Sequence, residues 1–163
     1  MSNMEFEDYS IQVKNAIHQN CLTFLTEATS EILSMTVRNS VRDTGQTAGS
    51  FTTSIDPSGM VGYVGSNYDN AIWEEFGTGE FAEKGDGRKG WWVYVKGSSK
   101  RSTGSKVYPT QGQAKRAVAM LRKKGLDAYY TRGKHARHPF RDAYNGSKNR
   151  IIRRATQIFG GMK

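Results

Sequence analysis

The sequence predicts an α+β fold in which a long N-terminal helix and a C-terminal helix pack on a small, mostly antiparallel sheet. Apolar residues recur every three or four positions over residues 13–35, as on one face of a helix. Two β-prone runs flank the turn-forming residues 57–59, and a helical pattern follows Pro139. We expect one domain over residues 1–163, with a strand-helix-strand insertion at about 91–131.

The first helix is predicted over residues 8–37, a length of ~45 Å at 1.5 Å per residue. Such a helix either spans the whole domain or extends beyond it to pack on a neighbour. The following "RDTGQTAGS" contains glycines and turn formers that end it. Its apolar stripe consists of Val13, Ile17, Cys21, Phe24, Ala28, Ile32 and Met35.

A hairpin and a short helix are predicted next. The hairpin lies within "FTTSIDPSGMVGYVGS", and Asn67 can cap the helix, which ends at Gly77. An inward stripe of Tyr68, Ile72 and Phe76 would leave Glu74 and Glu75 as an exposed acidic edge. The glycine-rich, charged run from residue 77 to residue 90 is predicted to be a mobile loop.

The insertion is predicted from two strand patterns around one helix. "WWVYV" and "DAYYT" are β-prone, while "KGSSKRSTGSK" between them is typical of a flexible segment. Thr110 caps the helix and Gly125 ends it, with Ala114, Ala117, Val118 and Leu121 inward. The last helix has the apolar positions Phe140, Tyr144, Ile151, Ala155 and Phe159.

Charge is divided unevenly along the chain, whose net charge is +9. Up to Glu83 there are 3 Lys and Arg against 12 Asp and Glu, a net charge of −9. From Lys84 onward there are 21 against 3, a net charge of +18. This division fits a nucleic-acid-binding protein, a subunit whose acidic surface meets the basic surface of a neighbour, or merely solvated faces.

The candidate catalytic and cofactor motifs are weak. Glu74 and Glu75 are adjacent on a helix and point about 100° apart, so they do not converge on one bond. "GDGRKG" matches G-x-G-x-x-G, but it follows a helix and precedes a strand, the reverse of a dinucleotide loop. The pairs His18 with Cys21 and His135 with His138 have no recognisable third ligand. We expect no enzymatic activity, no cofactor and no metal.

The sequence also bears on the compartment. Cys21 is the one cysteine, so no internal disulfide is possible. The N-terminus is acidic where a secretory signal would be basic, and no apolar run approaches ~20 residues. We expect a protein that is made in the cytoplasm and makes no contact with membranes.

Three segments resemble one protein family. They are "DTGQTAGSFTTSI", "NAIWEEFGTGE" and "ARHPFRDA", of which Glu-Phe-Gly-Thr-Gly at residues 75–79 is the most specific. In this order they are similar to motifs of the head-tail joining, or tail-completion, minor virion proteins of tailed bacteriophages, typified by the tenth gene product of a lambdoid coliphage. The chain departs from the family pattern at Asn70, His138 and Asp142.

The resemblance implies a non-enzymatic virion protein that forms an oligomeric ring at the head-proximal end of the tail and joins the tail to the head. Its partners would be itself, the neighbouring neck or connector proteins and a tail-tube or tail-terminator protein, with DNA passing through the channel as a further candidate. It would be located in the virion, and in the host cytoplasm during assembly. A basic nucleic-acid-binding protein is the alternative function. With the charge division, the resemblance gives a hypothetical interface of Trp73, Glu74, Glu75, Phe76, Glu80, Arg137 and Arg141.

Overall fold

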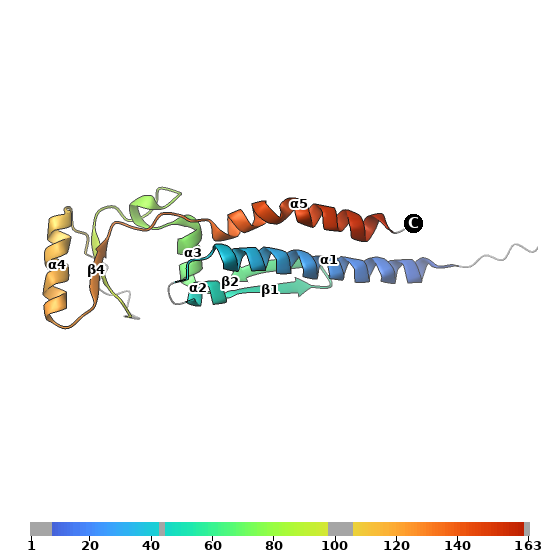
Figure 1. The fold of residues 1–163 in the computed structure, drawn as a ribbon, viewed down its shortest axis with the longest axis horizontal. Coiled ribbons are helices and arrows are strands. Elements are labelled where there is room, and N and C mark those ends of the chain that lie inside the picture. The colour runs from blue at the N-terminus through green and yellow to red at the C-terminus, as the bar shows by residue number, and fades with distance from the viewer. Residues whose placement is uncertain (1–7, 43–44, 98–105, 162–163) are drawn as a thin grey trace, which may run out of the picture. The chain divides into compact units, whose positions relative to one another are not determined.

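The protein is an α+β protein, as the sequence predicts. The structure is a computed structural model that describes residues 8–42, 45–97 and 106–161 (Figure 1). Its described residues fall into two compact units. The flanking unit is formed by the chain up to Tyr68 together with the chain from Pro139 onward, and the inserted unit comprises residues 69–138. The inserted unit is therefore wider than the strand-helix-strand segment expected at about 91–131.

The flanking unit is organised around its first helix. Helix α1 (Ser10–Asn39) lies between helix α5 (Pro139–Gly160) on one side and a β-hairpin on the other (Figure 1). The hairpin consists of β1 (Phe51–Asp56) and β2 (Val61–Ser66), and the short helix α2 (Gln46–Gly49) precedes it. Both long helices and the hairpin lie where the sequence predicts them.

The hairpin has a regular antiparallel register from the pair Phe51 and Ser66 to the pair Asp56 and Val61. In its turn, the Asp56 carboxylate accepts a hydrogen bond from the backbone N–H of Ser58 at 2.9 Å. Hydrogen bonds from Ser58, first from its hydroxyl, lower the pKa of Asp56. The carboxylate thus closes the turn as an acceptor for Ser58 and Gly59.

Helix α1 buries only its C-terminal two-thirds. Phe24 meets Phe159 near the end of α5, with ring centroids 5.9 Å apart. Val13 and Ile17, which the sequence places on the inward stripe, are exposed. The prediction is wrong for these two residues because α5 ends at Gly160, so no later turn of α5 covers the first turns of α1.

Small side chains line the buried face of α5. Ala143 and Ser147 are completely buried, whereas Tyr144, predicted to point inward, is exposed. On α1, Thr36 is also completely buried, and its hydroxyl donates to the Ile32 carbonyl at 2.8 Å. Small residues let the two helices approach closely, which is why the large ring of Tyr144 is turned outward.

The inserted unit contains a sheet with one covered face. Strands β3 (Trp92–Val95) and β4 (Ala128–Thr131) are antiparallel, and helix α4 (Gln111–Lys123) packs on them. The Thr110 side chain caps α4 as predicted by accepting from the Gln113 N–H. Most of the polar stretch expected to be flexible lies outside the described residues. The core cluster consists of Val93, Ala114, Val118 and Ala128.

Candidate interaction site

Helix α3 (Asp69–Phe76), the first element of the inserted unit, carries the residues that the sequence singles out. Its buried side chains are those of Ala71 and Glu74, not the predicted stripe of Ile72 and Phe76. Glu74 is only 5% exposed, and its carboxylate pairs with the Lys134 ammonium at 3.2 Å. The prediction of Glu74 as part of an exposed acidic edge is therefore wrong, because a cation distant in sequence pairs with it.

The segment after α3 is tied to residues 132–137 by a ladder of hydrogen bonds. The Thr78 N–H donates to the Lys134 carbonyl at 2.8 Å, and the Glu80 N–H donates to the Arg132 carbonyl at 2.9 Å. In the other direction, the Lys134 N–H donates to the Thr78 hydroxyl at 3.0 Å. The Arg137 N–H donates to the Glu74 carbonyl at 2.8 Å and extends the ladder to the end of α3.

Both glycines of the Gly-Thr-Gly turn are required by this ladder. Gly77 and Gly79 have φ angles of 72° and 62°, which residues other than glycine rarely adopt. A Cβ on Gly77 would lie 2.8 Å from the Lys134 carbonyl oxygen, and one on Gly79 would collide with the Arg132 carbonyl oxygen. The Gly-Thr-Gly turn thus brings the backbone of residues 74–80 close to that of residues 132–137. We call these two hydrogen-bonded segments the clamp.

The expected mobile loop after Gly77 begins as a packed turn. Residues Gly79–Phe81 form a 3-10 helix, and Gly79 is buried. One Glu80 oxygen accepts from the Gly90 N–H at 2.9 Å, and the other lies 3.4 Å from the Arg132 guanidinium. Glu80 therefore has two partners within its own unit, which the sequence did not predict.

The outward face of α3 is apolar and aromatic. Ile72, Trp73 and Phe76 are all exposed, with Trp73 at 45%. Exposed large apolar side chains that cluster on one short helix are typical of contact surfaces. Trp73 and Phe76 both belong to the hypothetical interface. The aromatic part of that hypothesis therefore still applies, whatever the role of the acidic residues.

The remaining residues of the hypothetical interface lie on different units. Glu75 is half-buried and the Arg137 side chain is exposed, both in the inserted unit. Arg141 is half-buried in the first turn of α5, in the flanking unit. Of the seven residues, the structure brings Trp73 and Phe76 together on one exposed helical face.

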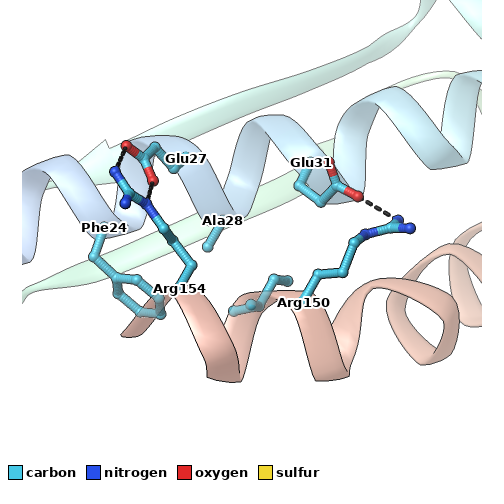
Figure 2. A pocket seen from close by; sticks show the side chains of 7 residues that line it. Phe24, Glu27, Ala28, Glu31, Arg150 and Arg154 are labelled. Atoms are coloured by element: carbon cyan, nitrogen blue, oxygen red, sulfur yellow. Dashed lines mark hydrogen bonds and ion pairs between the residues drawn. The ribbon is translucent and has the colours of Figure 1, made fainter. Parts of the chain in front are cut away.

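The acidic and basic parts of the sequence meet inside the flanking unit. Two ion pairs join α1 to α5, Glu27 with Arg154 and Glu31 with Arg150 (Figure 2). Arg154 binds both Glu27 oxygens, with its Nη2 donating at 2.8 Å to Oε1. The hydrogen bond from Arg154 lowers the pKa of Glu27.

A groove of about 150 Å³ lies between the two helices at these ion pairs. Figure 2 shows both carboxylates on α1 and both guanidinium groups reaching them from α5. Because each charged group already has a partner, the groove offers no unsatisfied charge to a ligand. It is lined by Phe24, Glu27, Ala28, Glu31, Arg150, Ile151 and Arg154.

No family model, curated protein or solved structure was found to match the chain. The helices in the described parts of the sequence include none with the length and apolar character of a bilayer span. Within the same parts, no group of three or more His, Cys, Asp and Glu is arranged to hold a metal ion. His135, one of the paired histidines, instead stacks on Phe81 with ring centroids 3.9 Å apart.

The sequence pattern did not predict the partners contributed by residues 132–134. Lys134 and Arg132 bind Glu74 and Glu80, respectively, across more than 50 positions of the chain. Their spacing of two matches a strand that alternates its side chains, but no local pattern links them to α3. The repeated Gly-x-Gly spacing could have indicated this contact, because glycines allow two backbone segments to approach closely as well as allowing phosphate binding.

Proposed function

We propose that this protein is a non-enzymatic structural subunit of a tailed-bacteriophage virion, which forms an oligomeric ring at the head-proximal end of the tail and joins tail to head. The observation that carries the proposal is an exposed apolar face on α3 whose C-terminal end is part of the Glu-Phe-Gly-Thr-Gly motif and is held by its backbone hydrogen bonds. The same motif is the most specific part of the family resemblance.

The clamp supports the proposal because it holds the end of α3 in a fixed position. Its backbone hydrogen bonds and the two close glycine contacts leave the turn little freedom. A rigid helix end that displays aromatic side chains needs little ordering when it binds a partner. The clamp therefore prepares Trp73 and Phe76 for a protein contact.

The proposed contact is apolar at its centre. Aromatic residues dominate the binding energy of most interfaces, and Trp is among the most enriched of them. Glu74 and Glu80 already have cationic partners within the subunit, so we place the apolar residues of α3 at the centre of the contact. We propose that Ile72, Trp73 and Phe76 fit a different surface of an identical subunit, since such heterologous contacts close into rings.

The oligomeric state of the purified full chain tests this proposal. We expect size-exclusion chromatography with light scattering to give a closed oligomer for the wild type. The double variant Trp73→Ala/Phe76→Ala removes two exposed rings and is expected to elute as a monomer with an unchanged circular dichroism spectrum. Tyr63→Ala, an exposed ring of β2, is the matched control and should assemble normally.

Two results would contradict the proposal. A wild-type chain that is monomeric at all concentrations, and is also absent from the neck of purified particles in cryo-electron microscopy, would exclude a ring subunit. Normal assembly of the Trp73→Ala/Phe76→Ala variant would instead exclude this face of α3 as the contact.

A further inference from the structure

The β3–β4 sheet of the inserted unit has one face that α4 does not cover. Residues directly opposite in an antiparallel pair point to the same face, and neighbours along a strand alternate. The register pairs Val93 with Tyr130 and Tyr94 with Tyr129. Since Val93 is in the core beneath α4, Tyr94 and Tyr129 point to the opposite, open face.

The side of the sheet that α4 does not cover carries three aromatic residues, two on β3 and one on β4. Tyr94 and Tyr129 are stacked, with ring centroids 5.7 Å apart and planes inclined by 25°. They are 45% and 37% exposed, so part of each ring remains accessible. Trp92 lies two positions before Tyr94 and therefore on the same side of the sheet, but it is half-buried and its ring lies against Gly79. We call these three residues the aromatic row.

Cations border the aromatic row at both ends. The Arg88 guanidinium lies 5.3 Å from the ring centroid of Trp92, and that of Arg122 lies 5.3 Å from the ring centroid of Tyr129. The Arg122 Nε also donates to the Ala128 carbonyl at 3.0 Å, which holds this side chain beside the strand. Lys96, immediately after β3, is close enough to Tyr129 to affect its pKa electrostatically.

One acid faces the same end of the row. A hydrogen bond to Asp127 raises the pKa of Tyr129, so Asp127 is engaged with the tyrosine hydroxyl. In the inserted unit as a whole, basic residues outnumber acidic residues. Residues 69–138 hold 15 Lys and Arg against 7 Asp and Glu, a net charge of +8. The potential around the row therefore favours a polyanion.

From these observations we propose that the open face of β3–β4 is a binding platform for single-stranded nucleic acid, with bases stacking on Tyr94 and Tyr129 and phosphates contacting Arg88, Lys96 and Arg122. Stacking requires bases whose faces are free, as they are in a single strand and not in a duplex. Flanking cations supply the sequence-independent affinity for the backbone. This proposal does not depend on ring assembly.

The test is fluorescence anisotropy with a labelled oligothymidine of about 16 nucleotides, within the usual site size of such platforms. We expect the full chain to bind it more tightly than a duplex of equal length. Tyr94→Ala/Tyr129→Ala should weaken binding about ten-fold or more for each ring removed, and Tyr94→Phe/Tyr129→Phe should retain binding because stacking does not need the hydroxyl. Lys96→Gln should lower the slope of log affinity against log salt by about 1.

Matched controls separate the platform from general basicity. Tyr63→Ala/Tyr144→Ala removes two exposed tyrosines of the flanking unit and should bind like the wild type. We expect this control and Tyr94→Ala/Tyr129→Ala both to have the circular dichroism spectrum of the wild type. No binding of the oligothymidine at low salt would overturn the proposal. Equal binding by Tyr94→Ala/Tyr129→Ala and the wild type, or preference for the duplex, would overturn it as well.

Discussion

The two units of the protein differ in net charge. Residues 1–68 and 139–163 hold 9 Lys and Arg against 8 Asp and Glu, a net charge of +1, whereas residues 69–138 have a net charge of +8. In the flanking unit, acids of α1 pair with arginines of α5, so the division seen along the sequence largely cancels in space. A charge division along a chain therefore does not by itself predict a division between surfaces.

The two units also differ in what holds them together. The flanking unit depends on side chains, because small residues let α1 and α5 approach and ion pairs border the contact. The inserted unit depends more on the backbone, through the ladder between residues 74–80 and 132–137. It follows that single changes in the ladder should cost more stability than changes in the exposed ion pairs.

The largest effect is expected for Gly79→Ala in the clamp. An alanine there would combine an unfavourable φ angle of 62° with a collision against the Arg132 carbonyl. We expect it to lower the free energy of unfolding by about 3 kcal/mol or more, measured by urea denaturation. Amide hydrogen exchange should show the loss of protection in residues 128–137 and not in α1.

Gly85→Ala is the matched control for this change. Gly85 also has a positive φ angle, 70°, but a Cβ there would have no atom within 4 Å. Only the backbone strain remains, and we expect a loss of about 1 kcal/mol. Equal losses for the two variants would mean that the clamp contact contributes nothing beyond strain.

An intermediate effect is expected for Glu74→Ala, which breaks the buried ion pair. Lys134 is partly exposed and can regain water, so the free energy of unfolding should fall by about 1–3 kcal/mol rather than by the full cost of an isolated buried charge. Glu74→Gln, which keeps the shape and an acceptor oxygen, should lose less. Wild-type stability for Glu74→Ala in the same urea titration would show that the pair is energetically neutral.

The smallest effect is expected for Glu27→Gln in the flanking unit, and it should depend on pH. The hydrogen bond from Arg154 lowers the pKa of Glu27 below its value in the unfolded chain. The stabilisation is therefore present above the ordinary glutamate pKa and is lost as pH falls through the folded pKa. Thermal melts should show a small difference between wild type and variant at about pH 7 that shrinks as the pH is lowered below the ordinary glutamate pKa of about 4.3. A difference that persists in acid would contradict the ion-pair explanation.

The elements that the sequence predicts correctly are those fixed by local patterns. The periodicity of α1, the cap at Thr110, the turn after Asp56 and the start of α5 at Pro139 each depend on residues within a few positions. These signals specify which segments are helix and strand. They also specify the α4 face, since Ala114 and Val118 are buried as predicted.

The orientation of α3 could not be predicted in the same way. Its apolar stripe suggested that Ile72 and Phe76 point inward, but the helix packs through Ala71 and Glu74. The reason is tertiary, because Lys134 supplies a cation from 60 positions away. A buried acid on a short helix contradicts the local pattern, and nothing near it in the sequence shows that a partner exists.

The two-part construction of the flanking unit has a consequence for synthesis on the ribosome. Helix α1 emerges early, yet the helix that covers Phe24, Glu27 and Glu31 follows 70 residues of inserted unit, from residue 69 to residue 138. Residues 40–138 separate α1 from α5, so at ordinary elongation rates of about 5–20 residues per second α5 begins to be synthesised roughly 5–20 s after α1 is complete. During that interval the inserted unit, which is continuous in sequence, can complete its own folding first. The nascent chain is therefore most vulnerable to aggregation through α1, before its last helix is made.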